Sequence, residues 1–289
     1  MENIYTLNKS ELPYLLKQIN DPPEKLFVRG KLPKEDAKIL CIVGARKYSS
    51  YGEEACKKLI SGLKGYNICI VSGLALGIDS IAHRSAMETG LQTIAFPGSG
   101  LDPNVLYPPS HKKLAEEIVY SGGALLSELE MMQTGADWTF PKRNRLMAGI
   151  SHATLVIEAR LKSGTLITSK LTTEYNRDVG AVPGSIFSSL SEGPNQLIDL
   201  GAKIIRSSDD IIEMLGLKKK GEMKSIQPSL FMNLSENEKK IVEFLQIESH
   251  TAEQIILKSG LSAKDINESL FSLEIASLIE ESNGKFRVK

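Results

Sequence analysis

A short basic segment that begins with an aromatic residue, Phe140-Pro141-Lys142-Arg143-Asn144-Arg145, has the residue types of a nucleic-acid contact. Arginine carries a planar fork of N–H donors that suits phosphate oxygens, and an aromatic ring can stack on an unpaired base. A structural interpretation is also open, in which Phe140 belongs to the core and Arg143 or Arg145 makes an internal ion pair. The residue types alone do not decide between the two for any single residue.

Glycine-rich turns and helix starts, each after a short apolar run, recur at 43–46, 71–79, 96–100 and 158–170. In a parallel sheet such turns meet at one edge, where glycine lets a ligand approach the backbone and free N–H groups at helix starts attract anions. Several anion sites along one edge suit a phosphate chain better than a small metabolite. The candidate binding residues in these turns are Arg46, Ser72, Gly73, Ser163, Gly164, Thr165 and Lys170.

The elements that must position these turns alternate along the middle of the chain. Seven runs that are apolar on both faces predict strands at 39–43, 67–71, 92–96, 124–126, 153–158, 180–182 and 203–205. Amphipathic segments between them predict helices at 52–63, 78–89, 111–120, 145–150, 166–176 and 195–200. This alternation predicts an α/β fold, a Rossmann-like, mostly parallel open sheet with helices on both faces.

The domain organisation follows from changes of composition. We expect a short N-terminal extension at 1–37 that packs on the core, the Rossmann-like domain at 38–217, a polar linker at 218–229 and a winged-helix domain at 230–289. The last of these combines helices at 236–246, 252–259 and 262–278 with a strand at 284–288.

The charge of the predicted winged-helix domain argues against strong DNA binding. Residues 229–289 hold seven Lys and Arg against ten Asp and Glu, a net charge of −3. Phosphate-binding modules carry an excess of basic residues on the docking face. We therefore expect this domain to contact protein, with its basic end at Lys285, Arg287 and Lys289 as the one feature that favours DNA.

The composition limits the classes of protein and of cellular location that the sequence allows. The 289 residues include 35 Lys and Arg and 35 Asp and Glu, so a nucleic-acid site must concentrate its positive charge locally. Cys41, Cys56 and Cys69 fall in a predicted strand, helix and strand, which favours buried reduced thiols and a cytoplasmic protein. Neither a signal peptide nor an apolar run of membrane-spanning length is evident, and we expect no membrane association.

The common enzyme motifs are not present in the sequence. It contains no Gly-x-x-x-x-Gly-Lys-Ser/Thr loop, no Gly-x-Ser-x-Gly elbow and no Cys-x-x-Cys pair, and its four histidines are scattered. We therefore expect no catalytic residue, no cofactor and no metal site.

A resemblance to a known family rests on motifs in chain order. They are Val43-Gly44-Ala45-Arg46, Tyr51-Gly52, Val71-Ser72-Gly73 and Gly77-Ile78-Asp79 with Ala82-His83, Pro97-Gly98-Ser99-Gly100-Leu101-Asp102 with Tyr107-Pro108, Leu126-Ser127-Glu128, the segment 140–145, Glu158-Ala159 with 163–168, and Val182-Pro183-Gly184. The series resembles the DNA-processing protein A family (DprA, also called Smf). The resemblance implies a homodimeric single-stranded DNA-binding protein that protects incoming DNA and helps load the RecA recombinase in natural transformation or DNA processing.

The same resemblance implies which residues bind DNA. They are Arg46, Phe140, Lys142, Arg143, Asn144, Arg145 and Lys170, with the turns at Ser72-Gly73 and Ser163-Gly164 beside them. Many members carry a helical N-terminal domain, of which the roughly 37 residues before the first predicted strand leave little room.

An enzyme is the alternative. The turn Ser163-Gly164-Thr165 with Glu174 partly resembles the glycine-rich turn and downstream glutamate of nucleoside-monophosphate phosphoribohydrolases. The paired glycines of that turn are absent here, and the segment 140–145 has no role in that chemistry.

Overall fold

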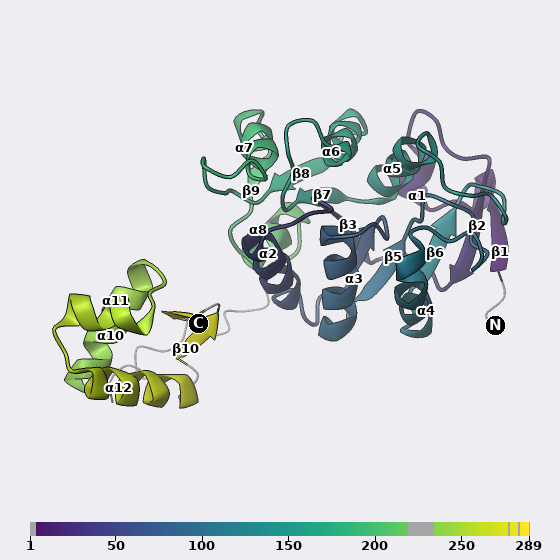
Figure 1. Ribbon diagram of the computed structural model, residues 1–289. Helices are drawn as coiled ribbons and strands as arrows, with labels where there is room; N and C mark the ends of the chain where they lie inside the picture. Colours follow the sequence, from purple (N-terminus) through teal and green to yellow (C-terminus); the bar gives the residue numbers. More distant parts are fainter. Residues whose placement is uncertain (1–3, 219–233, 277, 283, 289) are drawn as a thin grey trace. The chain divides into compact units, whose positions relative to one another are not determined.

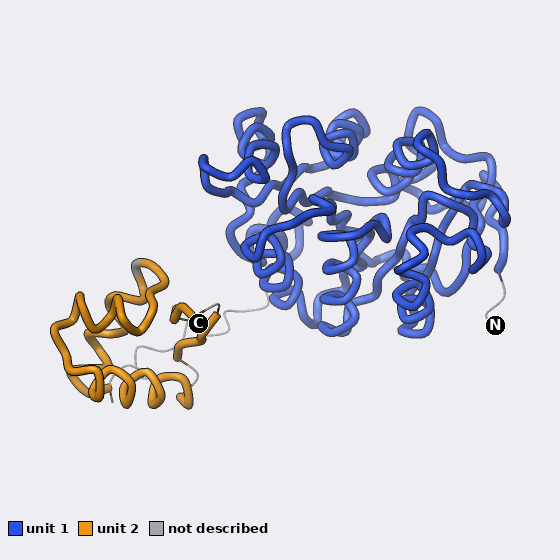
Figure 2. The backbone as a smooth tube through the Cα atoms, in the orientation of Figure 1, with its two compact units in different colours: residues 1–219 blue, residues 220–289 orange. Residues whose placement is uncertain are grey.

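The computed structural model describes residues 4–218, 234–276, 278–282 and 284–288. The chain forms two compact units, residues 1–219 and 220–289, which we call the N-terminal and C-terminal units (Figure 2). The linker expected at 218–229 lies outside the described residues except for Lys218.

The described part of the N-terminal unit is built on a nine-stranded sheet in the order β1-β2-β6-β5-β4-β3-β7-β8-β9 (Figure 1). Strands β3 to β9 are parallel, whereas β1 and β2 pair in antiparallel fashion at one edge. The strands are β1 Ile4–Asn8, β2 Lys25–Gly30, β3 Lys38–Val43, β4 Ile68–Ser72, β5 Gln92–Ala95, β6 Ala124–Ser127, β7 Ala153–Val156, β8 Asp178–Ala181 and β9 Lys203–Ile204. The predicted Rossmann-like, mostly parallel sheet is confirmed.

The N-terminal stretch is part of the sheet itself. It contributes β1 and β2, which the sequence analysis did not identify as strands. Leu26 and Val28 of β2 are fully buried, and the antiparallel pairing of β2 with β6 extends the sheet beyond its parallel part. Burial of apolar side chains explains why β2 forms a strand, whereas the mostly exposed β1 is held by its antiparallel pairing with β2.

Helices cover both faces of the sheet (Figure 1). Alternate residues of β3 face opposite cores: Leu40 and Ile42 pack with α2, α3 and α8, and Cys41 and Val43 pack with α1 and α5. The helices are α1 Tyr14–Lys17, α2 Ser50–Ser61, α3 Ile78–Thr89, α4 Lys112–Tyr120, α5 Thr139–Ile150, α6 Gly164–Glu174, α7 Glu192–Asp199 and α8 Ser208–Met214, with 3-10 turns η1 Lys9–Glu11 and η2 Pro109–His111.

Helix α5 begins earlier than predicted. The predicted helix starts at Arg145, whereas the observed helix begins at Thr139, so the basic segment forms its first two turns. Proline is tolerated in the first turn of a helix because the N–H that it lacks would have no partner there. Pro141 and the polar residues after it concealed the helix from a search for apolar periodicity.

The order of the strands reverses beside β3. The chain proceeds outward from β3 through β4 and β5 to β6, and α5 then returns it to β7 on the other side of β3. In open α/β sheets, ligands bind outside the carboxyl ends of the strands at such a switch point, because the loops there diverge and leave a crevice.

The described C-terminal unit contains α10 Glu236–Ile247, α11 Ala252–Ser259 and α12 Ala263–Ile275, followed by the antiparallel strands β10 Ile279–Ser282 and β11 Lys285–Val288. Ser235 and Thr251 cap α10 and α11 as their sequence positions suggest. Arg287 lies 2.7 Å from Glu280, and Lys264 lies 3.9 Å from Glu268. These acidic partners reduce the positive charge that either basic residue offers to DNA.

The three cysteines are free and buried, as expected. Burial raises the pKa of the Cys41 and Cys56 thiols to about 12. No helix of the described residues is long and apolar enough to cross a membrane.

Candidate nucleic-acid interface

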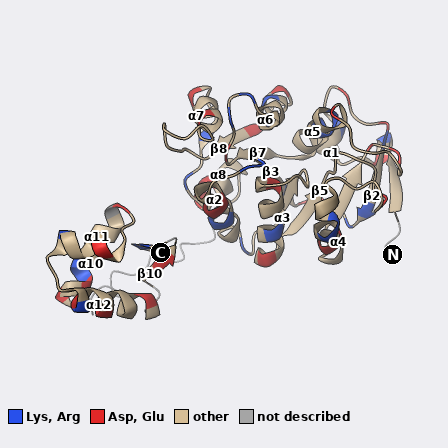
Figure 3. Ribbon diagram, in the orientation of Figure 1, with Lys and Arg blue, Asp and Glu red and all other residues tan. Residues whose placement is uncertain are grey.

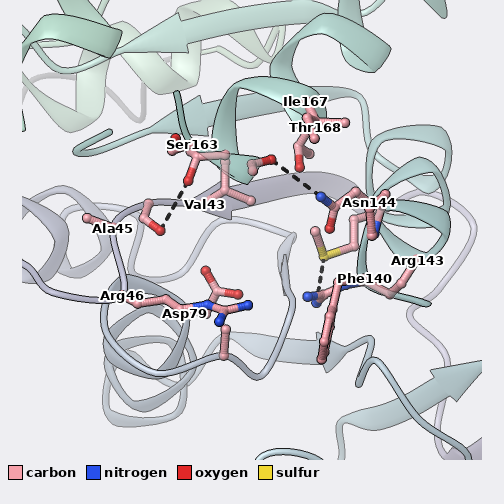
Figure 4. A pocket seen from close by; sticks show the side chains of 16 residues that line it. Val43, Ala45, Arg46, Asp79, Phe140, Arg143, Asn144, Ser163, Ile167 and Thr168 are labelled. Atoms are coloured by element: carbon pink, nitrogen blue, oxygen red, sulfur yellow. Dashed lines mark hydrogen bonds between the residues drawn. The ribbon is translucent and has the colours of Figure 1, made fainter. Parts of the chain in front are cut away.

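A pocket of about 250 Å³ lies at the switch point between β3 and β7. Its walls come from the turn after β3, the first turns of α5 and the start of α6, and Figure 4 shows their side chains around it. The predicted site residues that line it are Arg46, Phe140, Arg143, Asn144, Ser163, Gly164 and Thr165.

Phe140 is the half-buried aromatic residue of this pocket. The Arg46 guanidinium lies 5.6 Å from the centre of the Phe140 ring, and the Tyr107 ring centre is 5.2 Å away. A smaller hollow of about 30 Å³, lined by Gly73, Tyr107 and Phe140, lies beside the pocket. A ring that borders two hollows and carries a cation beside it is placed to stack on a base.

Two glycines make room for these side chains. A Cβ atom at Gly98 would overlap the Phe140 ring, and one at Gly73 would overlap the Arg143 guanidinium. The sequence predicts that glycines in these turns admit a ligand. At these two positions the space is filled by the protein's own side chains.

Arg143 lies on the floor of the pocket beside Asp79. Its Nη1 atom donates to the carbonyl oxygen of Phe96 at 2.7 Å, and its Nε atom has no hydrogen-bond partner among the described residues. Asp79 accepts from the backbone N–H of Gly73 at 3.1 Å. Burial raises the pKa of Asp79, and the positive charge of Arg143 opposes that shift.

Burial lowers the pKa of Arg143, and the nearby Asp79 carboxylate opposes that shift as well. Because Asp79 offsets Arg143, the exposed Arg46 supplies most of the positive charge at the pocket.

The start of α6 forms the opposite wall. Thr165 Oγ1 donates to the carbonyl oxygen of Gly44 at 3.3 Å, and Asn144 Nδ2 donates to that of Gly164 at 3.4 Å. Ser163 precedes the helix, and its hydroxyl is buried and has no partner in the described part of the chain. This hydroxyl and the N–H groups of the first turn are donors that suit an anion.

Five predicted site residues lie outside the pocket, and one of them, Gly73, lines the smaller hollow beside it. Ser72 is buried and donates to the carbonyl oxygen of Ile42 at 2.6 Å. Arg145 is buried and pairs with Glu128 and Asp21, which matches the ion-pair interpretation left open for it. Lys142 Nζ lies 3.7 Å from Glu128.

Lys170, the fifth, lies 3.8 Å from Glu174 and lines a separate hollow between α6 and β9. The helical repeat explains the division within α5: Phe140, Arg143 and Asn144 share one face, whereas Lys142 and Arg145 lie off it.

Two exposed aromatic residues near the pocket were not among the predicted site residues. Tyr107, 41% exposed, contacts Phe140, and Trp138, 55% exposed, has Lys142 Nζ 5.9 Å from its ring centre. Tyr107 follows an irregular loop. An aromatic residue in a loop is a sequence signal for a binding residue, because loops lie on the surface and carry many binding residues.

The structure separates the parts of the alternative enzyme site. Glu174 is the last residue of α6, ten residues after Gly164, so the helix places it about 15 Å from the turn. It is not among the residues that line the switch-point pocket.

In the view of Figure 3, Lys and Arg alternate with Asp and Glu over the helices of the N-terminal unit. This distribution agrees with the balanced charge of the whole chain. The positive character of the interface therefore has to come from individual residues around the pocket.

The sequence profile of the family described as DNA recombination-mediator protein A matches residues 3–216. The chain is 39% identical to Protein Smf of Escherichia coli over 203 residues, which cover 70% of this chain and 54% of that protein. It is 40% identical to the DNA processing protein DprA of Streptococcus pneumoniae over 200 residues, 69% of this chain and 70% of that protein.

Solved structures give the same result. The structure of DprA from Streptococcus pneumoniae matches with a TM-score of 0.68 and 37% identity over 73% of this chain and 74% of that one. DNA processing protein A from Helicobacter pylori matches with a TM-score of 0.65 and 29% identity over 74% of this chain and 96% of that one, and its structure is described for its single-stranded DNA binding mode.

Proposed function

The chain belongs to the DNA recombination-mediator protein A family, and on this premise we propose that it binds single-stranded DNA at the switch-point pocket. The observation that carries the proposal is the half-buried Phe140 ring between two hollows with the Arg46 guanidinium 5.6 Å away. An unpaired base stacks on the ring, and Arg46 binds the neighbouring phosphate. The buried Ser163 hydroxyl and the N–H groups of the first turn of α6 offer donors to a second phosphate.

The first prediction concerns the form of the DNA. We expect tighter binding to single-stranded than to duplex DNA, because stacking on Phe140 requires an unpaired base. If about four phosphates are neutralised, log affinity falls with log salt at a slope of about −3. Titration of labelled oligothymidylate and of a matched duplex at several salt concentrations measures both quantities. Equal affinity for the two forms, or a response independent of salt, contradicts the proposal.

We also propose that the protein forms a homodimer through the β9 edge of the N-terminal unit. Strand β9 ends the sheet, and Leu200 beside it and Ile204 within it are 75% and 44% exposed. An unpaired strand edge with apolar side chains favours association. A dimer that presents two sites to one strand gains apparent affinity through effective concentration.

Sedimentation at micromolar concentration tests the dimer. We expect the double substitution Leu200→Arg and Ile204→Arg to yield a monomer, because two charges are then placed at an apolar contact. Tyr120→Arg on α4, at a residue 95% exposed, is the matched control and leaves the dimer intact. A wild-type monomer with and without DNA overturns this part of the proposal.

On the basis of the family, we also propose that the protein helps load the RecA recombinase. We propose further that it binds DNA without acting as an enzyme. The separation of Glu174 from the Ser163 turn supports the absence of phosphoribohydrolase chemistry. RecA loading is tested on DNA coated with single-strand-binding protein, where we expect the protein to make RecA filaments form faster. The absence of enzymatic activity is tested with nucleoside monophosphates, from which we expect no release of base.

A further inference from the structure

We propose that the bound strand continues from the pocket into a second, basic hollow that holds its next phosphates. This hollow, which we call the basic hollow, is lined by Ala45, Arg46, Lys47, Arg160, Lys162, Ser163 and Leu190. The inference rests on the proposed function and adds Lys47, Arg160 and Lys162 to the residues that contact DNA.

The basic hollow adjoins the pocket. It has a volume of about 280 Å³ and shares Ala45, Arg46 and Ser163 with the pocket. Its walls are the turn after β3 and the loop after β7, the two segments that diverge at the switch point. A chain of phosphates can therefore pass from one to the other along Arg46.

The charges of the basic hollow are of one sign. Arg46, Lys47, Arg160 and Lys162 are exposed, and within the described residues no carboxylate lines the hollow or forms an ion pair with any of the four. Lys142 and Lys170, by contrast, lie 3.7 and 3.8 Å from glutamates. In a chain of zero net charge, four cations around one hollow form a local site for a polyanion.

A carboxylate close in the sequence, that of Glu158, forms no ion pair with these four cations among the described residues. Glu158 precedes Arg160 in the same loop, but it is 1% exposed and is hydrogen-bonded to the backbone N–H and hydroxyl of Ser49 at the start of α2. A Cβ atom at Gly52 would overlap its carboxylate, so Glu158 is enclosed by α2.

The backbone that carries the cations is held in place. The N–H of Ala159 donates to the carbonyl oxygen of Leu190 at 2.8 Å, and the N–H of Gly193 donates to that of Ala159 at 2.9 Å. Arg160 and Lys162 therefore extend from an anchored loop. The buried hydroxyl of Ser163, without a partner among the described residues, adds a neutral donor at the boundary of the two hollows.

Contacts to bases and contacts to phosphates lie on opposite sides of Arg46. Tyr107 and Phe140 lie on one side and offer rings to bases, whereas Lys47, Arg160 and Lys162 lie on the other and offer only charge. Arg46 lines the pocket, the smaller hollow and the basic hollow. The basic hollow should thus add affinity and salt dependence without any base preference.

Oligothymidylates of two lengths, about 4 and about 20 nucleotides, test the inference, because sites of this kind cover roughly 4–16 nucleotides. The triple substitution Lys47→Ala, Arg160→Ala and Lys162→Ala is expected to lower the salt slope on the long oligomer by about 2, at about 0.7 per phosphate contact. On the short oligomer the salt slope is expected to change by less than about 0.7, the contribution of one phosphate contact.

A matched control removes three exposed lysines at the opposite, amino edge of the sheet, through Lys34→Ala, Lys58→Ala and Lys64→Ala. It changes the net charge equally, and its slope on the long oligomer is expected to equal that of the wild type. An equal effect of the control and test variants overturns the inference, because net charge then explains the loss.

The remaining outcomes separate the inference from the proposed function. If the wild type binds both oligomers and the test variant keeps the wild-type slope, the basic hollow does not hold the strand, although the proposed function stands. If the wild type binds neither oligomer, the proposed function itself fails, and the inference with it. If the test variant loses the binding of inorganic phosphate but keeps the wild-type slope on the long oligomer, the hollow is a site for a free anion and the inference is overturned.

Discussion

Replacing Arg145 by methionine is expected to destabilise the N-terminal unit by up to about 3–5 kcal/mol, because the buried Glu128 then loses its direct partner and keeps only the more exposed Lys142, whose Nζ lies 3.7 Å away. The side chains of Arg145 and Glu128 are each 10% exposed and pair directly, and Arg145 also lies 3.1 Å from Asp21. Urea unfolding followed through Trp138, the single tryptophan, measures the loss, because Trp138 immediately precedes α5.

The double variant Arg145→Met and Glu128→Gln is the control. Removal of both charges leaves no buried carboxylate without its direct arginine partner, so we expect the double variant to be less destabilised than the sum of the two single variants. If Arg145→Met lowers the free energy of unfolding by less than about 1 kcal/mol, the Arg145–Glu128 pair contributes no more than an ordinary exposed ion pair, and the prediction is contradicted. Salt slopes on DNA, measured where the variant is folded, are expected to be unchanged.

Phe140→Ala is expected to weaken binding to single-stranded DNA by about 1–3 kcal/mol with the salt slope unchanged, because a stacking contact is lost and no phosphate contact is removed. Phe140→Leu is the matched variant, since it keeps an apolar side chain against Gly98 and lacks the ring. We expect it to bind as weakly as the alanine variant.

A thermal melt accompanies both Phe140 variants. Phe140 is half-buried, so some loss of stability is expected, but both proteins should remain folded at the temperature of the titration. If Phe140→Ala unfolds the protein while Phe140→Leu restores full DNA binding, the ring belongs to the core and the stacking role is wrong.

The features predicted correctly from the sequence are local ones. Seven strands were predicted, and for β3 to β7 the signal is an apolar run such as 39–43 or 153–158, because a strand buried on both faces must be apolar throughout. Helix α3, Ile78–Thr89, was predicted with both ends correct, and it lies between two capping glycines, Gly77 and the left-handed Gly90. The caps at Ser235 and Thr251 also depend only on neighbouring residues.

The features that the sequence did not reveal depend on distant partners. Strands β1 and β2 exist because β2 pairs with β6, almost a hundred residues later, and no local pattern encodes that partner. The division of the basic segment depends on Glu128 and Asp21, which pair with Arg145 and hold it outside the pocket. Gly73 matters because Arg143 occupies the space above it.

The switch-point pocket joins segments that are far apart in the sequence, as the hydrogen bond between Thr165 and Gly44, 121 residues earlier, illustrates. A nascent chain that has not yet reached α6 therefore lacks one wall of the site, and it acquires the site only when the returning strand β7 docks beside β3. Ligand affinity is thus linked to the folding equilibrium of the whole sheet. A DNA strand present at a hundred times its Kd stabilises the assembled unit by about 2.7 kcal/mol, and the same linkage makes every mutation that loosens the sheet weaken DNA binding when unfolding becomes appreciable.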